Sequence, residues 1–130
     1  MKISLGRIVL LVRDYDEALR FYETNLGAKI LSDTISESGK RYLHIRFEEK
    51  SVGIWFLKAE TPEQLERVGK QTGGMPCMVF YTDDLEEAYK QLLRNKVTIS
   101  KLPVNEDETA FSFLHFLDLY GNEIVLVQLN

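Results

Sequence analysis

The sequence predicts an α+β fold in which one β-α-β-β-β module occurs twice, and a repeat within the chain is the main evidence. The segment RIVLLVRDYDEALR begins at Arg7, and CMVFYTDDLEEAYK begins at Cys77, an offset of 70 residues. In both segments an apolar run precedes an acidic turn, at Asp14 or Asp84, and an amphipathic stretch follows it. A duplication of this kind predicts two copies of a small module that pack together, with any binding site between them.

The first module is expected to span residues 1–58. Alternating aliphatic residues over 7–13 predict a strand with one well-buried face. Asp14 is at an N-cap position, Glu17 follows three residues later, and Gly27 is at the C-terminal glycine position, so the spacing predicts a helix over 14–26. Three further strands are expected over 29–32, 41–47 and 52–57, separated by the turn-like residues 36–40 and the polar tip 48–50.

Residues 59–76 are expected to link the modules, with a short helix that begins at Thr61-Pro62 and a break at Gly73-Gly74. The second module, residues 77–130, repeats the order with a strand to Thr82, a helix over 84–95 and a strand over 97–100. An acidic loop is expected over 104–109. The ranges 111–117 and 123–129 are expected to form a closing hairpin, whose Gly121-Asn122 pair tolerates positive φ. We expect the two modules to make one domain over 1–130.

Composition argues against several classes of function. Apolar residues make up 45% of the chain, which is enough for a core. The net charge of -4, the pI near 5.2 and the lack of a basic cluster argue against binding to nucleic acid. Cys77 is the single cysteine, so neither an internal disulfide nor a multi-cysteine zinc site is expected. No run approaches the ~20 apolar residues of a membrane helix, and Arg13 interrupts the first apolar run too early for a signal peptide. We expect a cytoplasmic protein with no nucleic-acid or membrane partner.

Two motifs in this order resemble the vicinal oxygen chelate superfamily, which includes glyoxalase I, extradiol dioxygenases, fosfomycin-resistance enzymes and bleomycin-resistance proteins. The first motif runs from Val12-Arg13-Asp14 through Phe21-Tyr22 to Leu26-Gly27. The second, DLYGNEIVL from Asp118 to Leu126, is similar to the DPDGNxxEL hairpin of the superfamily. The resemblance covers essentially the whole chain. It implies paired curved mixed sheets around a cleft, and a homodimer.

The resemblance also implies where a metal would bind. Metal-using members place their ligands on the inner faces of the paired sheets, near the start of the first strand and in the last strand of each module. The corresponding positions here are Arg7, Trp55, Cys77 and Val125. Arginine, tryptophan and valine do not coordinate a divalent ion, and one cysteine does not complete a site of three or four ligands. We therefore predict no metal and no other cofactor; a relocated site made of His44, His115 and Glu123 is the alternative.

The predicted cleft combines cationic, imidazole and aromatic side chains. Antiparallel pairing across the 48–50 tip places Trp55 opposite His44, and alternation places Arg46 on the same face. His115 takes a ligand-facing position by resemblance to the fosfomycin-resistance branch, where an aromatic residue has this spacing from the hairpin. The candidate ligand-binding residues are Arg7, His44, Arg46, Trp55, Cys77, Tyr81, Phe113, His115 and Val125.

Each candidate also has a structural explanation. The arginines favour an anionic ligand, or they pair with a local acid such as Glu123. The aromatic residues stack on a planar ligand or belong to the core, and the histidines are acid–base groups or structural residues. Cys77 is a reactive thiol if Arg7 lies beside it, and otherwise a small buried apolar residue. No catalytic residue is assigned.

These observations predict a metal-free protein that binds a small, partly aromatic or acidic organic molecule, as the bleomycin-resistance branch does. The alternative is an enzyme, such as a glyoxalase-like lyase, isomerase, hydrolase or dioxygenase. It would use either a relocated metal or direct chemistry by Cys77 or a histidine. The fold alone does not decide between a binding protein and an enzyme.

Overall fold

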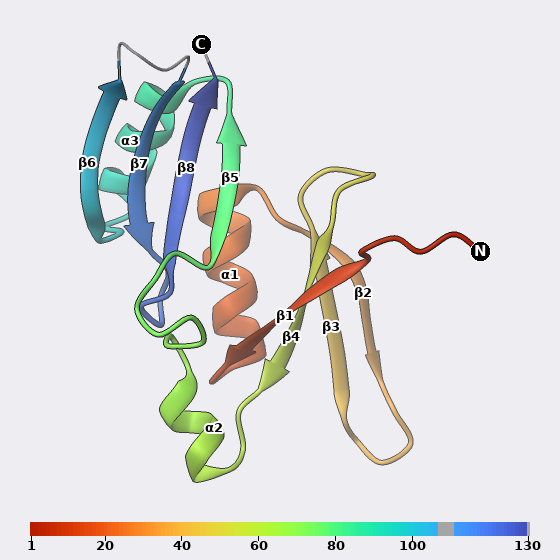
Figure 1. Cartoon of the computed structure of the whole chain (residues 1–130). Helices are drawn as coiled ribbons and strands as arrows, with labels where there is room; N and C mark the ends of the chain where they lie inside the picture. The colour runs from red at the N-terminus through yellow and green to blue at the C-terminus, as the bar shows by residue number, and fades with distance from the viewer. Residues whose placement is uncertain (107–110, 130) are drawn as a thin grey trace. The chain divides into compact units, whose positions relative to one another are not determined.

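The computed structural model describes residues 1–106 and 111–129, and the chain divides into two units, Met1–Val68 and Gly69–Asn130 (Figure 1). The elements of the first unit are β1 (Arg7–Val12), α1 (Tyr15–Leu26), β2 (Lys29–Ile35), β3 (Arg41–Arg46), β4 (Gly53–Lys58) and α2 (Pro62–Arg67). Those of the second unit are β5 (Met78–Thr82), α3 (Leu85–Arg94), β6 (Ile99–Glu106), β7 (Phe111–Leu117) and β8 (Glu123–Leu129).

Each unit is built on a four-stranded mixed sheet, and the two sheets have the same strand order. The order is β1-β4-β3-β2 in the first unit and β5-β8-β7-β6 in the second. The first strand of each unit pairs in parallel with the last, and the other neighbours are antiparallel. The predicted α+β fold with two β-α-β-β-β modules is therefore confirmed.

The strand register repeats as well as the order. Val9 pairs with Trp55 between β1 and β4, and Val79 pairs with Val125 between β5 and β8. His44 lies opposite Trp55, and His115 lies opposite Val125. The two histidines therefore occupy equivalent positions in the two modules, a relation that the sequence analysis did not identify.

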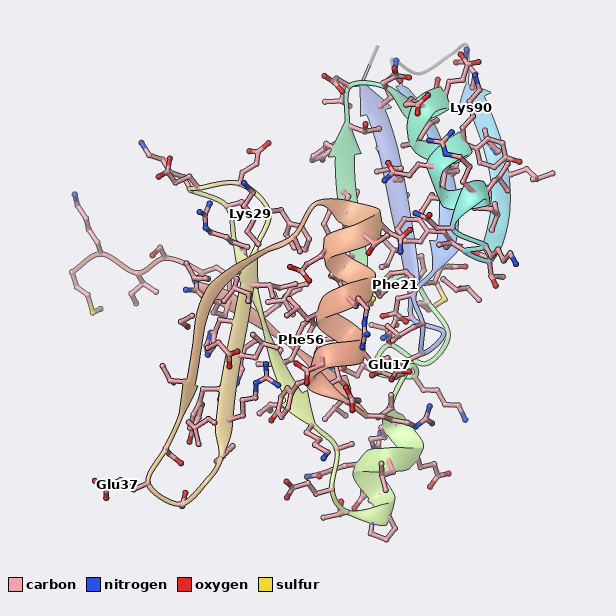
Figure 2. The ribbon with its side chains drawn as sticks, turned by 180° about the vertical axis from the view of Figure 1, so that it is seen from behind. Glu17, Phe21, Lys29, Glu37, Phe56 and Lys90 are labelled. Atoms are coloured by element: carbon pink, nitrogen blue, oxygen red, sulfur yellow. The ribbon has the colours of Figure 1, made fainter. Side chains whose placement is uncertain are left out.

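Helix α1 begins and ends where the sequence predicts, and it covers one face of the first sheet. The Asp14 carboxylate accepts a hydrogen bond from the Glu17 N–H at 2.8 Å, and Gly27 ends the helix with φ of 68°. The ring of Tyr22 packs against that of Phe56, with 5.7 Å between centroids, and Figure 2 shows Phe56 pointing from β4 toward α1. The buried core of this unit includes Leu10, Val12, Ala18, Tyr22, Leu43, Ile45, Ile54 and Phe56.

The second unit follows the same plan. Asp84 caps α3 by accepting a hydrogen bond from the Glu87 N–H at 3.0 Å. Leu85 and Leu92 of this helix are buried, and the other buried apolar side chains on the strands are Leu114, Phe116, Ile124 and Leu126. The hairpin between β7 and β8 is held by a buried polar pair, Asp118 and Asn122, which are 5% and 3% exposed.

The Asp118 carboxylate satisfies the donors of this hairpin turn. One oxygen accepts from the backbone N–H groups of Tyr120 and Asn122, both at 2.9 Å, and the other accepts from the Asn122 side-chain amide at 2.9 Å. Of the Gly121-Asn122 pair, Gly121 alone adopts a positive φ, of 96°. Asn122 therefore acts through its hydrogen bonds and not through the left-handed conformation that the sequence predicted for the pair.

Some predicted boundaries were wrong. Strand β2 extends to Ile35 and not to residue 32. The predicted loop over 104–109 was wrong for residues 104–106, which belong to β6 and pair with β7; residues 107–109 lie outside the described residues. β6 is an edge strand, where charged residues are compatible with backbone pairing. No helix of the described residues has the length and apolar character needed to span a bilayer.

Candidate functional site

The face of the first sheet opposite α1 carries a row of aromatic side chains. In β3, the side chains of Leu43 and Ile45 are buried on the α1 side, so Tyr42 and His44 lie on the other face by alternation. The imidazole of His44 stacks on the indole of Trp55 with 5.5 Å between centroids and an angle of 8°. The Tyr42 ring lies 6.2 Å from Trp55 at 28°. The predicted contact between His44 and Trp55 is present in the structure.

A cation lies at each end of this row. The Arg7 Nε donates a hydrogen bond to His44 Nδ1 at 3.3 Å, and Arg7 Nη1 donates to the Gly6 carbonyl at 2.7 Å. At the other end, the Lys40 Nζ lies 5.2 Å from the centroid of the Tyr42 ring. We call the set of Arg7, His44, Trp55, Tyr42 and Lys40 the Trp55 face.

Gly53 creates the space in which Arg7 reaches His44. Gly53 and Arg7 are paired between β4 and β1. A Cβ on Gly53 would lie 3.1 Å from Arg7 Cδ and 3.3 Å from Nε, and 2.5 Å from the Ile45 carbonyl oxygen. Burial and, to a smaller degree, the Arg7 charge lower the pKa of His44. The Trp55 face therefore holds a neutral imidazole at neutral pH, because both causes disfavour its protonated form.

Trp55 adds an unused hydrogen-bond donor to this face. Its indole Nε1 is buried and has no hydrogen-bond partner within the described parts of the chain. A buried donor without a partner costs roughly 1–3 kcal/mol, and native structures contain few of them. The indole N–H is therefore covered by protein atoms and unpaired, and a ligand acceptor would reach it only if its neighbours moved.

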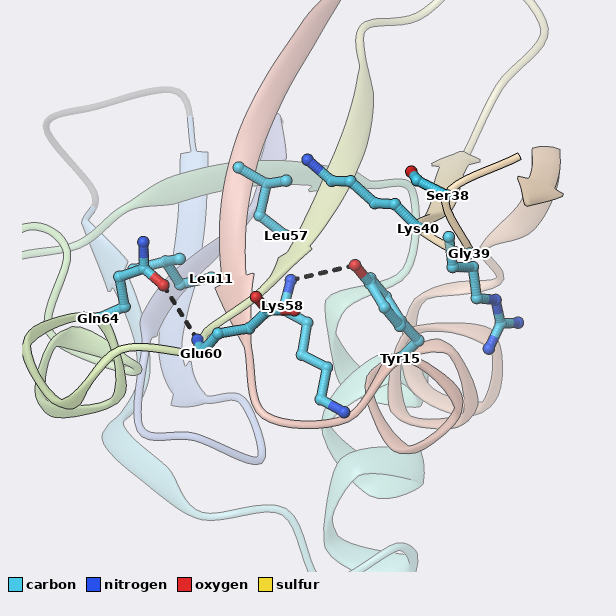
Figure 3. Close-up of a pocket in the computed structure, with 10 residues that line it drawn as sticks. Leu11, Tyr15, Ser38, Gly39, Lys40, Leu57, Lys58, Glu60 and Gln64 are labelled. Carbon is cyan, nitrogen blue, oxygen red and sulfur yellow. Dashed lines mark hydrogen bonds between the residues drawn. The ribbon is translucent and has the colours of Figure 1, made fainter. Parts of the chain in front are cut away.

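A pocket of about 530 Å³ adjoins the Trp55 face at its Lys40 end (Figure 3). It is lined by Leu11, Tyr15, Ser38, Gly39, Lys40, Arg41, Leu57, Lys58, Glu60 and Gln64. Two hydrogen bonds shape its wall: the Lys58 backbone N–H donates to the Tyr15 hydroxyl at 3.3 Å, and the Glu60 N–H donates to Gln64 Oε1 at 3.0 Å. The apolar part of the lining comes from Leu11 and Leu57.

The charges of the pocket differ in how far they are neutralised. Arg41 pairs with Asp33 at 2.9 Å and with Asp16 at 3.0 Å, and these contacts raise the pKa of Arg41 and lower that of Asp33. Among the described residues, no carboxylate lies within ion-pair distance of the Lys40 or Lys58 ammonium. These two lysines are therefore the cations that a ligand anion could use.

The second unit places several other candidates on one face of its sheet. His115 lies opposite Val125, and its Nδ1 is 3.5 Å from Glu123 Oε1. Phe113 is tilted against His115 with 5.8 Å between ring centroids, and the Lys101 Nζ lies 5.0 Å from the Phe113 centroid. Tyr81 is 72% exposed, so it does not belong to the core of this unit. The sequence named Glu123 together with His115 and His44 only as an alternative metal site, and the structure brings Glu123 beside His115.

Cys77 has the environment of a protonated thiol. It lies just before β5, and its backbone N–H donates to the Glu123 carbonyl at 2.8 Å. Burial, followed by the negative charges of Asp118 and Glu123, raises the pKa of Cys77 to about 11. Cys77 is half-buried, and these features favour an unreactive thiol over a reactive thiolate.

Arg46 does not join the Trp55 face through a direct contact. Its backbone pairs with Lys29 of β2, and its side chain is half-buried on the same face as His44 by alternation. Within the described residues, the Arg46 guanidinium forms no hydrogen bond or ion pair. Its predicted role in ligand binding remains a prediction, as do those of the other candidates.

The residues at the implied metal-ligand positions do not fit a divalent ion. The repeated register supports the equivalence of Trp55 with Val125, and neither side chain has a suitable donor. Arg7 brings a fixed positive charge, and Cys77 supplies a single donor where a site needs three or four. Across the described residues, no group of three or more His, Cys, Asp and Glu side chains is arranged to hold a metal.

The fold and register agree with a match to a known sequence family. Residues 4–126 match the profile of the Glyoxalase/Bleomycin resistance protein/Dioxygenase superfamily. The chain belongs to this superfamily. An uncharacterized protein from Shewanella frigidimarina (strain NCIMB 400) is 33% identical over 132 residues, which cover 100% of this chain and 96% of that protein.

Solved structures show the same fold. The crystal structure of UcmS2 has a TM-score of 0.80 at 23% identity and covers 98% of both chains. TnmS3, described as an antibiotic binding protein from Streptomyces sp. CB03234, has a TM-score of 0.76 at 23% identity; the match covers 100% of this chain and 99% of TnmS3. At this level of identity the likeness supports the fold alone.

Sequence analysis missed three members of the site and its pocket. Tyr42 is two residues before His44 in a strand, so alternation alone could have placed it on the Trp55 face. Lys40 precedes the strand in a hairpin tip, where no sequence pattern fixes the direction of a side chain. The importance of Gly53 for Arg7 depends on the β1–β4 register, which required the structure.

Proposed function

We propose that this protein binds a small planar organic anion on the Trp55 face and that this binding requires no metal ion. The observation that carries the proposal is the stack of Tyr42, Trp55 and His44 with Arg7 and Lys40 at its two ends. Membership of the superfamily is compatible with ligand binding and with catalysis, so the choice depends on the chemistry of this face.

Each component of the face favours one property of the ligand. Aromatic rings stacked at these distances favour a planar π-system, with about 0.5–1.5 kcal/mol per aromatic pair beyond simple burial. A guanidinium group and an ammonium group favour carboxylate or phenolate oxygens. Because His44 Nδ1 accepts from Arg7, its neutral ring carries the proton on Nε2 and offers a further donor.

Planar antibiotics and planar aromatic metabolites are the ligand classes to test first. TnmS3, which shares the fold, is described as an antibiotic binding protein. We extend this to the present chain because the Trp55 face has both the aromatic area and the cations that a planar anionic compound needs. The pocket of about 530 Å³ next to Lys40 is large enough to accept a substituent of such a ligand.

The test uses the fluorescence of Trp55, which is the single tryptophan of the chain. Anthraquinone-2-carboxylate serves as a planar anion, and anthraquinone-2-carboxamide serves as a neutral probe of the same shape. We expect the anion to quench Trp55 fluorescence saturably and to bind about tenfold more tightly than the amide, since one charge-assisted contact contributes about 1.5 kcal/mol.

Matched variants separate the face from general charge effects. Arg7→Gln and Lys40→Gln each remove one cation from the Trp55 face, and the variant that removes the cation in contact with the carboxylate should abolish most of the preference for the anion. Arg20→Gln removes an exposed cation of α1 and should leave both affinities unchanged. Equal binding of anion and amide to the unmodified protein, or equal losses in all three variants, would contradict the proposal.

We further propose that the protein is a cytoplasmic homodimer and that its two units form a single domain. Val79 and Tyr81 of the edge strand β5 are 57% and 72% exposed, which provides an apolar surface for a second copy of the chain. The single Cys77 suits a reducing compartment. Light scattering at micromolar concentration should give twice the chain mass, and urea unfolding should show one transition by all probes.

A further inference from the structure

In the second unit a histidine lies within ion-pair distance of a carboxylate. His115 Nδ1 lies 3.5 Å from Glu123 Oε1, and the side chains are 19% and 24% exposed. The other carboxylate oxygen of Glu123 accepts a hydrogen bond from the Ser100 hydroxyl at 3.1 Å. Glu123 is therefore fixed from both sides, by β6 and by β7.

The partners of the two equivalent histidines impose opposite proton positions. A carboxylate only accepts, so the contact with Glu123 places the proton of a neutral His115 on Nδ1 and leaves the Nε2 lone pair available. A guanidinium only donates, so Arg7 requires an unprotonated Nδ1 on His44 and leaves the proton on Nε2. The duplicated position therefore supplies a donor in the first unit and an acceptor in the second.

His115 has charged neighbours of both signs. The Glu123 carboxylate on β8 lies 3.5 Å from its Nδ1, and the backbone of Lys101 on β6 pairs with that of His115. Phe113 packs against the ring and limits its rotation.

We propose that His115 is a proton-accepting site for an acidic hydroxyl group, such as that of a phenol or an enol, and that Glu123 is its positioning residue. In this step the O–H bond of the ligand breaks, the proton moves to His115 Nε2, and the electron pair remains on the ligand oxygen. His115 keeps its Nδ1 proton directed at Glu123. The resulting ligand anion lies beside an imidazolium that Glu123 stabilises.

This inference rests on the proposed function because it needs a small-molecule ligand, but it uses different residues. It also gives the enzyme alternative a specific form. A histidine oriented by a carboxylate is the arrangement that general bases use, and an enol or phenol proton is one that such a base can remove. Ser100 would act only through Glu123, and Cys77, held as a thiol, has no part in the step.

The first test is the tautomer of each neutral histidine, measured by long-range proton–nitrogen NMR correlation. The chain has two histidines, and His44→Gln assigns the two sets of signals. We expect His115 in the Nδ1–H form and His44 in the Nε2–H form. Glu123→Gln should mix the His115 tautomers, with Ser100→Ala as a milder variant if Glu123→Gln unfolds the protein. An Nε2–H form of His115 in the unmodified protein would overturn the proposal.

The second test uses 4-nitrophenol, whose phenolate absorbs visible light. At a mildly acidic pH, added protein should raise the phenolate fraction and lower the apparent pKa of the bound probe by about one unit, the effect of a neighbouring cation. His115→Gln should abolish this shift, Glu123→Gln should reduce it by at least half, and Arg20→Gln, at an exposed position of α1, should leave it unchanged. No shift at the solubility limit of the probe, or equal shifts in all variants, would overturn the proposal.

The two proposals can fail separately. Loss of the 4-nitrophenol shift with intact quenching of Trp55 by anthraquinone-2-carboxylate would remove the role of His115 and leave the binding function in place. A 4-nitrophenol shift without Trp55 quenching would remove the proposed binding on the Trp55 face and leave the role of His115 in place.

Discussion

Replacement of Gly53 by alanine should displace Arg7 from His44 and destabilise the first unit. The new Cβ would lie 2.5 Å from the Ile45 carbonyl oxygen, a contact about 0.5 Å shorter than the 3.0 Å below which Cβ contacts are essentially never found. Because the nearest atom belongs to the β3 backbone, β4 has to shift. The same Cβ would lie 3.1 Å from Arg7 Cδ and 3.3 Å from Nε, so the Arg7 side chain has to move as well.

The expected cost follows from two opposing effects. Overpacking of a well-packed site costs about 1–3 kcal/mol. The change from glycine to alanine also lowers the conformational entropy of the unfolded chain, which stabilises the folded protein by about 0.4–1 kcal/mol. We therefore expect Gly53→Ala to lower the free energy of unfolding by about 1–2 kcal/mol in urea titrations. Gly6→Ala is the matched control, because a Cβ on Gly6 has nothing within 4 Å and its φ is not positive.

The site supplies an independent readout of the same variant. Arg7 is the second cause, after burial, of the lowered pKa of His44, so its displacement should raise this pKa in an NMR titration of the histidine ring protons. Gly6→Ala should leave the titration unchanged. The account of the Trp55 face would be refuted if Gly53→Ala matched Gly6→Ala both in stability and in the His44 titration.

Three further outcomes are expected. A rise in the pKa of Cys77 from 9.0 to about 11 lowers its thiolate fraction about 100-fold at neutral pH. The more basic thiolate is about tenfold more nucleophilic, which offsets part of this loss. Cys77 should therefore react with a disulfide reagent about tenfold more slowly than a small-molecule thiol does. Asp118→Ala should cost about 3 kcal/mol in urea unfolding, since it leaves three buried or half-buried donors of the hairpin without their acceptor, and Asp118→Asn should cost less. The pKa of His44 is lower in the folded protein than in the unfolded chain, so the unfolded chain binds a proton there more readily. The free energy of unfolding should therefore fall as the pH drops from about 6.5 to the pKa of His44 in the folded protein. His44→Gln should weaken this dependence of stability on pH.

Each of the three has a result that would contradict it. A Cys77 reaction faster than that of the reference thiol would show a stabilised thiolate. Equal stability of Asp118→Ala and the unmodified protein would show that the hairpin turn does not depend on its carboxylate. The third prediction would be contradicted if the free energy of unfolding rose on acidification and His44→Gln removed this rise.

The repeat and the helix caps made most of the fold predictable from the sequence. Asp14 and Asp84 mark the helix starts because local capping depends on the nearest few residues. The contact of His44 with Trp55 followed from the short turn between two strands and from side-chain alternation. The strand character of residues 104–106 was missed because pairing with β7 outweighs the local composition.

The charged partners of the site could not be predicted in the same way. The contact of Arg7 with His44 depends on the parallel register of β1 and β4 and on the missing side chain at Gly53, which are far apart in the sequence. The contact of His115 with Glu123 is diagonal across β7 and β8, and long side chains at such positions have several rotamers. Side-chain direction at a polar surface is a tertiary property, so the sequence grouped His115 and Glu123 only as an alternative metal site and did not pair Arg7 with His44.

The most direct test of the central claim is a titration of Trp55 fluorescence with anthraquinone-2-carboxylate, carried out in parallel with EDTA and with added Zn²⁺ or Mn²⁺. The account predicts saturable quenching with the same dissociation constant in all three conditions, because Arg7, Trp55 and Val125 provide no metal ligands at the positions that the family uses. Quenching that disappears in EDTA and returns with Zn²⁺ or Mn²⁺ would contradict the claim that this protein binds its ligand without a metal.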